Sequence, residues 1–235
     1  MKTVYFNVQS KGGAGKSMLT YFQALKHEDN PKACFVDLDS STKTSKRQLK
    51  FLHEQERLFE IDIYDRARKI EREKLFDVLD ILSATGFEAI FIDFGAPESE
   101  QLPALLTMDF TLDEFKEFEA SLGLRFVFNI IMAGGPAYIP CFDYLKSMIQ
   151  LVGGYFETCC YINEHTFSGC LELMDEVTEF AKLTKVKFGV KRFGNIQTDR
   201  SSGQTIMGYV SQGRGFQEFE TFTSRTIMKR ELARL

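Results

Sequence analysis

Residues 11–17 combine the residue types and the spacing that could bind phosphate. Three of the four residues from Gly12 to Gly15 are glycines, so the backbone can turn tightly and bring consecutive N–H groups close to one anion. A helix is expected to begin near Lys16, and its N-terminus adds a positive dipole at the same place. Lys16 supplies a full charge for the β- and γ-phosphates of a nucleotide, and the Ser17 hydroxyl suits a Mg²⁺ ligand. The predicted phosphate-binding loop consists of Gly12, Gly13, Ala14, Gly15, Lys16, Ser17 and Met18.

The loop follows an apolar run, residues 4–8, which reads as a buried strand. The general pattern G-x-x-x-x-G-K-[ST] is met at Gly15, Lys16 and Ser17, whereas Ser10 occupies its first glycine position. The segment from Lys11 to Ser17 resembles the deviant Walker A box, K-G-G-x-G-K-[ST], of the ParA/MinD family of P-loop ATPases. The resemblance implies ATP hydrolysis with Mg²⁺ in a homodimer, in which Lys11 reaches the nucleotide of the other subunit. A glycine-rich turn that binds nothing is the alternative.

Two aspartates follow the next predicted strand, residues 33–36. Ligands of open parallel sheets bind at the carboxyl ends of the strands, where Asp37 and Asp39 are expected. In the resembled family a D-x-D segment stands here, which implies that Asp39 orients the attacking water and that Asp37 lies near the Mg²⁺ shell. The family often continues with Pro-Gln, whereas Ser40 and Ser41 follow in this chain. A capping or loop role for the two aspartates remains the alternative.

Two further strands are predicted to end in polar residues that complete the site. The apolar residues 89–92 lead to Asp93, whose carboxylate can hold Mg²⁺ next to Ser17. Residues 94–97 then match the family's switch II loop in part. Asn163 follows the apolar strand 156–162, and the resemblance implies that its amide recognises adenine, while a plain loop role stays equally open. Residues 194–197 are expected to line the base.

Composition and the order of elements indicate one α/β domain over residues 1–235. Strands and helices alternate, which predicts a doubly wound, mostly parallel sheet with helices on both faces. Residues 44–85 are expected to be mostly helical, and residues 186–190 to form the last strand. With 23 Phe and no Trp, phenylalanine should fill much of the core. No apolar run is long enough to span a membrane, and the five cysteines show no metal spacing, so a cytoplasmic protein with reduced thiols is expected.

The C-terminal segment, residues 182–235, is basic although the whole chain has a net charge of −4. It holds eleven Lys and Arg against four Asp and Glu, a surplus of +7, which leaves −11 for the rest of the chain. This asymmetry indicates a polyanion partner, and an ordinary solvated surface is the equal alternative. Residues 217–235 are expected to form a closing helix on the sheet, the alternative being a basic amphipathic element that binds DNA or a membrane.

Three functional hypotheses follow. The first is a ParA-like ATPase for plasmid partition, stability or conjugative transfer, which dimerises on ATP, binds DNA through its basic segment and acts with a partner protein. The second is a MinD-like regulator that cycles on a membrane. The third is a small-molecule ligase of the dethiobiotin synthetase kind, for which the scattered histidines at 27, 53 and 165 supply no distinct catalytic constellation.

Overall fold

The computed structural model describes residues 1–38, 47–65, 67 and 71–235. Within these residues, seven strands form one sheet in the order β3-β2-β4-β1-β5-β6-β7, and every pair is parallel. The predicted α/β class and the parallel sheet are confirmed. The strands are β1 (Lys2–Val8), β2 (Ala33–Asp37), β3 (Leu58–Glu60), β4 (Ala89–Asp93), β5 (Leu124–Met132), β6 (Glu157–Asn163) and β7 (Gly189–Phe193).

The sheet order places β1 at the point where the winding reverses. β1 pairs with β4 on one side and with β5 on the other, although both strands lie far along the chain from it. Crossovers leave the sheet on opposite faces at such a point, so a crevice opens at the carboxyl ends of the strands. The loop after β1 therefore lies where open α/β sheets bind their ligands.

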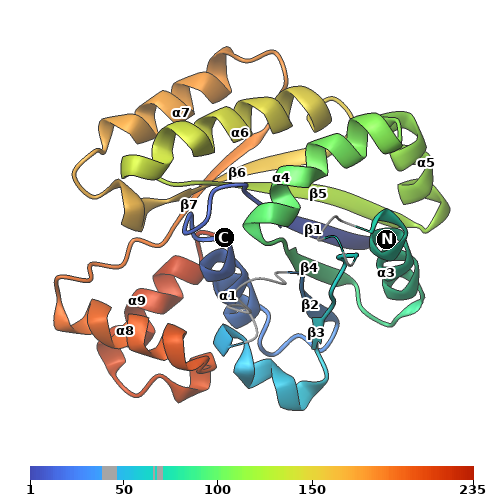
Figure 1. The fold of residues 1–235 in the computed structure, drawn as a ribbon. Helices are drawn as coiled ribbons and strands as arrows, with labels where there is room; N and C mark the ends of the chain where they lie inside the picture. Colours follow the sequence, from blue (N-terminus) through green and yellow to red (C-terminus); the bar gives the residue numbers. More distant parts are fainter. Residues whose placement is uncertain (39–46, 66, 68–70) are drawn as a thin grey trace.

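Helices cover both faces of the sheet (Figure 1). The α-helices are α1 (Lys16–Lys26), α3 (Arg72–Ala84), α4 (Ala96–Ala104), α5 (Leu112–Ser121), α6 (Tyr138–Val152), α7 (Glu172–Leu183), α8 (Ser201–Gln212) and α9 (Phe222–Leu232). The shorter helices are η1 (Lys50–Gln55), η2 (Leu105–Asp109), η3 (Gly135–Ala137), η4 (Glu164–Phe167) and η5 (Phe216–Glu218). Helices α4 to α7 lie on one face, and α1, α8 and α9 lie on the other. None of the described helices is long and apolar enough to cross a membrane.

Phenylalanine fills much of the core, as its abundance predicts. On the face covered by α4 to α7, the Phe6 ring stacks on Phe128 with centroids 4.9 Å apart. On the opposite face, Phe91 stacks between Tyr5 and Phe35, at 4.7 and 4.9 Å. Large apolar side chains on both faces of a central strand hold the two helical layers against one sheet.

Residues 44–85 are mostly helical in their described part, but they also contain a strand that was not expected. A 3₁₀-helix, η1, and an edge strand, β3, precede the single long helix α3. The β3 strand pairs with β2, with Leu58 opposite Phe35. Because three residues are enough for an edge strand and the surrounding sequence is charged, periodicity gave no strand signal here.

Three other boundaries differ from the sequence-based expectation. The last strand, expected at residues 186–190, lies three residues later, at β7. Residues 94–97 do not form an open loop throughout, since α4 already begins at Ala96 with Pro97 in its first turn. Helix α8 was not expected at all; its sequence contains Gly203 and Gly208, and glycine lowers helix propensity.

Candidate functional site

The loop between β1 and α1 has the backbone geometry expected of an anion site. Gly13 and Gly15 have φ of 76° and 107°, a region that residues with a Cβ rarely adopt. Gly15 is the N-cap of α1 and no side chain caps that helix, so its first N–H groups are left for another partner. A Cβ at Gly12 or Gly13 would meet nothing within 4 Å, which leaves room beside the loop. The loop is therefore an open cradle of amides at a helix N-terminus.

The Lys16 side chain lies back across the loop rather than in solvent. Its Nζ donates a hydrogen bond to the Gln9 carbonyl oxygen at 2.9 Å, and the residue is 8% exposed. Gln9 is held in turn by its own amide, which donates to the Ile131 carbonyl at 2.6 Å. The charge of Lys16 is thus positioned at the start of the same loop whose glycines present their amides.

The three predicted metal ligands come together. Ser17 donates its hydroxyl to Asp93 Oδ2 at 2.8 Å, which joins the first turn of α1 to the end of β4. Asp37 ends the neighbouring strand β2, in register with Asp93, and both carboxylates are buried. Among the described residues, no group of three or more His, Cys, Asp or Glu could hold a metal alone. A hydroxyl and one or two carboxylates beside a phosphate cradle fit Mg²⁺ that also binds phosphate oxygens.

Asn163 lies at the back of the phosphate-binding loop. Its Nδ2 donates to the Ala14 carbonyl at 3.0 Å, and the residue is 2% exposed. A Cβ on Gly15 would lie 2.3 Å from this amide nitrogen, and a Cβ on Gly194 would lie 2.7 Å from its oxygen. The amide therefore fits only because glycine stands at both positions. Asn163 Oδ1 is buried and has no hydrogen-bond partner in the described part of the chain, so reading a base with that oxygen remains a prediction.

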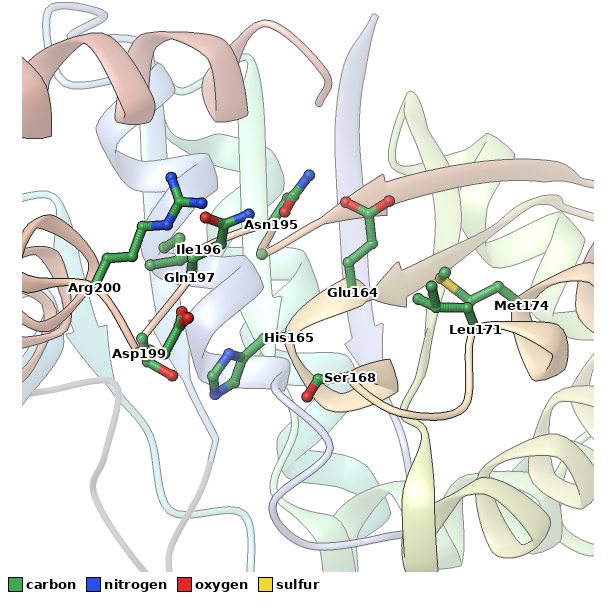
Figure 2. Close-up of a pocket in the computed structure, with 12 residues that line it drawn as sticks. Glu164, His165, Ser168, Leu171, Met174, Asn195, Ile196, Gln197, Asp199 and Arg200 are labelled. Carbon is green, nitrogen blue, oxygen red and sulfur yellow. The ribbon is translucent and has the colours of Figure 1, made fainter.

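A pocket of about 450 Å³ adjoins Asn163 and opens between the ends of β6 and β7 (Figure 2). The segment from Gly194 to Gln197, expected to line a base, lines it. Figure 2 shows Asp199 and His165 next to each other on one side of it, with Leu171 and Met174 at the other side. Amide groups combined with apolar side chains suit a heteroaromatic base, since amides both donate and accept. We call this cavity the base pocket.

Lys11 is exposed on the loop, while its backbone N–H donates to Gln9 Oε1 at 3.2 Å. The side chain is thus directed away from the interior of its own subunit's fold. Asp39, expected to act on water, lies outside the described residues. Lys11 and Asp39 therefore keep the roles that the resemblance implies, as predictions.

A buried polar network below the site was not expected from the sequence. Asn7 on β1 donates to Thr20 Oγ1 at 2.8 Å and to Gln23 Oε1 at 2.7 Å, and it accepts from Asn129 on β5 at 2.9 Å. All four residues are buried. One sign of this network was present in the sequence, namely an asparagine within each of two largely apolar strands, Asn7 in β1 and Asn129 in β5. Because buried amides require partners, the network fixes α1, and so the loop before it, against the sheet.

The five cysteines are free, and four of them are buried. Burial raises the pKa of the Cys34 thiol to about 12 and that of the Cys159 thiol to about 11. Thiols that stay protonated in apolar surroundings are poor nucleophiles. These two cysteines are packing residues, as expected of thiols within strands.

Solved structures share this fold, although the sequence comparisons find no match. No protein-family model matches the sequence, and no curated protein matches it in sequence. A chain of the MinC:MinD cell division protein complex of Aquifex aeolicus matches with a TM-score of 0.54, at 12% identity over 100% of this chain and 94% of that chain. A nucleotide-binding protein in complex with ADP, from Archaeoglobus fulgidus, matches with a TM-score of 0.50, at 12% identity over 94% of this chain and 89% of that chain.

These likenesses concern the fold. A plasmid partition protein of Borrelia burgdorferi also matches, over 89% of this chain and 96% of that chain, but at 15% identity and a TM-score of 0.42 it bears on no functional argument. The chain shares its fold with the first two of these structures, and the resemblance inferred from residues 11–17 is confirmed at the level of the fold.

Proposed function

We propose that this protein is an ATP-hydrolysing switch of the ParA/MinD type, which dimerises when ATP binds. The observation that carries the proposal is the contact between Ser17 and Asp93, 2.8 Å, beside the glycine-rich loop and the buried Lys16. A hydroxyl on the first helical turn and a carboxylate at the end of a neighbouring strand form the metal-binding half of a P-loop site. The amides and Lys16 form its phosphate-binding half.

Each residue has one task in the proposed reaction. The loop amides and Lys16 bind and orient the phosphates, which is most of what catalysis of phosphoryl transfer requires. Ser17 and Asp93 would hold Mg²⁺, with Asp37 close to its shell, and bound Mg²⁺ would neutralise charge on the phosphate oxygens. Asp39 positions the attacking water. Lys11 of a second subunit stabilises the negative charge that develops as the bond between the β- and γ-phosphates breaks.

Hydrolysis resets the dimer in this proposal, so the protein acts as a switch rather than as a metabolic catalyst. The exposed position of Lys11 supports dimerisation, because a lysine that contacts the nucleotide of a neighbouring subunit must project from the surface of its own subunit. Ile139, which is 65% exposed, lies in the first turn of α6, the helix whose Cys141 carbonyl accepts from Gln9 in the loop. An exposed apolar side chain near the loop suits a surface that a second subunit covers.

The first candidate for the surface on which the switch acts is DNA. Not every basic residue of the C-terminal segment is available to bind DNA. Arg214 pairs with Glu220 at 2.7 Å, and Arg234 pairs with Glu164 at 2.6 Å. Arg225 donates to the Phe219 carbonyl and keeps its charge. Lys229 and Arg230 are exposed on α9, and no described carboxylate lies within salt-bridge distance of either. These two residues are the strongest candidates for contacts to DNA phosphates.

A membrane surface is the second candidate, and one observation favours it. Phe222 at the start of α9 is 85% exposed, on the same helix as Arg225 and Lys229. An exposed aromatic ring beside basic residues can insert at the boundary of an anionic bilayer. Phe222→Ser separates the candidates, because it should release the protein from anionic vesicles and leave duplex binding unchanged if DNA is the surface.

Calorimetric titration with ATP and Mg²⁺ tests the proposed function directly. Lys16→Ala should weaken ATP binding by roughly 10- to 150-fold, since a charge-assisted contact contributes about 1.5–3 kcal/mol. Lys26→Ala removes the same charge from the last turn of the same helix and is the matched control. Equal ATP affinity in the two variants would contradict a phosphate-binding role for the loop.

Single-turnover hydrolysis tests the residue that lies outside the described structure. Asp39→Ala should bind ATP normally and hydrolyse it slowly, which would trap the dimer. An unchanged rate would remove Asp39 from the mechanism and transfer its role to Asp37.

A further inference from the structure

A second cavity, of about 440 Å³, lies on the other side of the β7–α8 connection from the base pocket. Three arginines line it, Arg200 at the start of α8 and Arg230 and Arg234 on or just after α9. Ser202 and Gly203 of the first turn of α8 also line it, and Glu231 is the one carboxylate among its lining residues. We call this cavity the arginine pocket.

The carboxylate in the arginine pocket is already satisfied. Glu231 Oε1 accepts from Arg234 at 2.9 Å, and its Oε2 accepts from the backbone N–H of Asn195 at 3.1 Å. Arg234 has a second carboxylate partner, Glu164, at 2.6 Å. Arg234 thus pairs with both carboxylates, Glu164 also lies 3.9 Å from Arg192, and neither of the other two arginines is within salt-bridge distance of them.

Arg200 and Arg230 are the uncompensated charges. Within the part of the chain that the structure describes, no carboxylate lies within salt-bridge distance of either guanidinium. Two positive side chains that face one concavity repel each other unless an anion enters between them. Guanidinium groups also present paired N–H donors that match the oxygens of a phosphate.

Backbone groups of the first turn of α8 also line the arginine pocket. Arg200 is the N-cap of α8, a helix of 12 residues, and no side chain caps it. A Cβ on Gly203 would lie 2.0 Å from the Gln197 carbonyl oxygen, so glycine allows the first turn to pack directly on the connection from β7. The first N–H groups of α8 therefore follow Arg200 directly and have no side-chain cap.

We propose that the arginine pocket is a binding site for a phosphate group, held by Arg200 and Arg230 with the first turn of α8. The phosphate can belong to a nucleic-acid backbone or to a small phosphorylated compound, since both present the same oxygens. The site does not depend on ATP hydrolysis. It shares Asn195, Gln197 and Arg200 with the base pocket, so its occupant lies next to a bound nucleotide.

The test measures how inorganic phosphate changes the unfolding temperature, against chloride at equal ionic strength. The Lys16→Ala variant is the background, because the loop after β1 would itself bind phosphate. A ligand that binds only the folded state raises the unfolding temperature with its concentration. The rise should be lost in Arg230→Gln and in Arg200→Gln, and should persist in Lys185→Gln, an exposed lysine of the same basic segment.

An equal rise in all three glutamine variants would overturn the site. The unfolding temperatures in chloride show that each variant is folded, and wild-type protein saturated with Mg²⁺ and ADP serves as a second background. Because the first background lacks Lys16, failure of the proposed ATPase function would leave this result unaffected.

A 20-base-pair duplex distinguishes the two sources of the phosphate. Fluorescence anisotropy at low salt should show duplex binding that Arg200→Gln with Arg230→Gln weakens at least tenfold, and that Lys185→Gln leaves unchanged, if the phosphate belongs to nucleic acid. Loss of the phosphate-dependent rise without any change in duplex binding assigns the site to a small phosphorylated compound.

Discussion

Arg234 Nη2 lies 2.6 Å from Glu164 Oε2, a contact between the C-terminal end of the chain and the turn that follows β6. Arg234 also donates to Glu231 at 2.9 Å, and Glu231 accepts from the Asn195 backbone at 3.1 Å. Burial lowers the pKa of Arg234, but the hydrogen bond to Glu164 and the charge of Glu231 more than offset it, so the pKa is raised above its usual value. Glu164 and Asn195 both line the base pocket, so α9 is fixed directly to that pocket.

Arg234→Gln should lower the free energy of unfolding by about 1–3 kcal/mol, because two mostly buried carboxylates lose a charged donor. Arg234→Gln should also weaken nucleotide binding, since Glu231, which accepts a hydrogen bond from the Asn195 backbone, is no longer held by Arg234. Urea denaturation and ATP titration measure the two effects. Arg230→Gln, on the preceding helix α9 and exposed, should change the free energy of unfolding by less than about 0.5 kcal/mol. Equal stability of the two variants would show that the Arg234 contacts are not retained in solution.

The Ser17–Asp93 contact predicts how nucleotide binding depends on Mg²⁺. In Asp93→Asn, ATP should still bind the loop, but added Mg²⁺ should no longer strengthen that binding, because a neutral amide is a poor ligand for this ion. Titration with ATP in the presence of Mg²⁺ and of EDTA measures the difference. Asp80→Asn, an exposed acid on α3, should respond to Mg²⁺ like the wild type. A normal Mg²⁺ response in Asp93→Asn would exclude this carboxylate as a ligand.

Lys11 is predicted to act between subunits. Lys11→Ala should bind ATP with unchanged affinity as a monomer, and should fail to dimerise, because its exposed charge would no longer reach the second nucleotide. Gel filtration coupled to light scattering, with and without ATP, measures this, and the dimer-trapping Asp39→Ala variant is the positive control. If Lys11→Ala still formed dimers with ATP, Lys11 would have no role between the subunits.

His27 predicts a dependence of stability on pH. Burial, Lys26 and Arg57 lower the pKa of His27 below 6.5 in the folded chain. As the pH falls below about 6.5, the unfolded chain therefore binds a proton that the folded chain does not, and the free energy of unfolding decreases. Urea denaturation at pH 7 and pH 5 should show a smaller decrease for His27→Gln than for the wild type. Equal decreases would mean that His27 titrates alike in both states.

The phosphate-binding loop was predictable from the sequence because its function depends on local backbone geometry. Gly13 and Gly15 adopt positive φ, Lys16 and Ser17 follow within one helical turn, and strand, turn and helix are contiguous. Apolar runs likewise predicted β1, β2, β4 and β6 to within two residues, because a strand buried on both faces is apolar at nearly every position. That Asp37 and Asp93 lie near Ser17 also followed, since parallel strands end at one edge of the sheet.

Only the tertiary structure decided the roles of polar residues whose partners lie far along the chain. Arg57 reads as a surface charge, yet it is 4% exposed and donates to the carbonyls of His27, Glu28 and Ala33, where it closes the end of α1. Asn163 could be assigned to a strand end, but not to its contact with Ala14. Arg234 was counted with a DNA-binding surface, whereas it pairs with Glu164, 70 residues away. Charge and polarity are properties of single residues, but a hydrogen-bond partner is set by which elements the fold brings side by side.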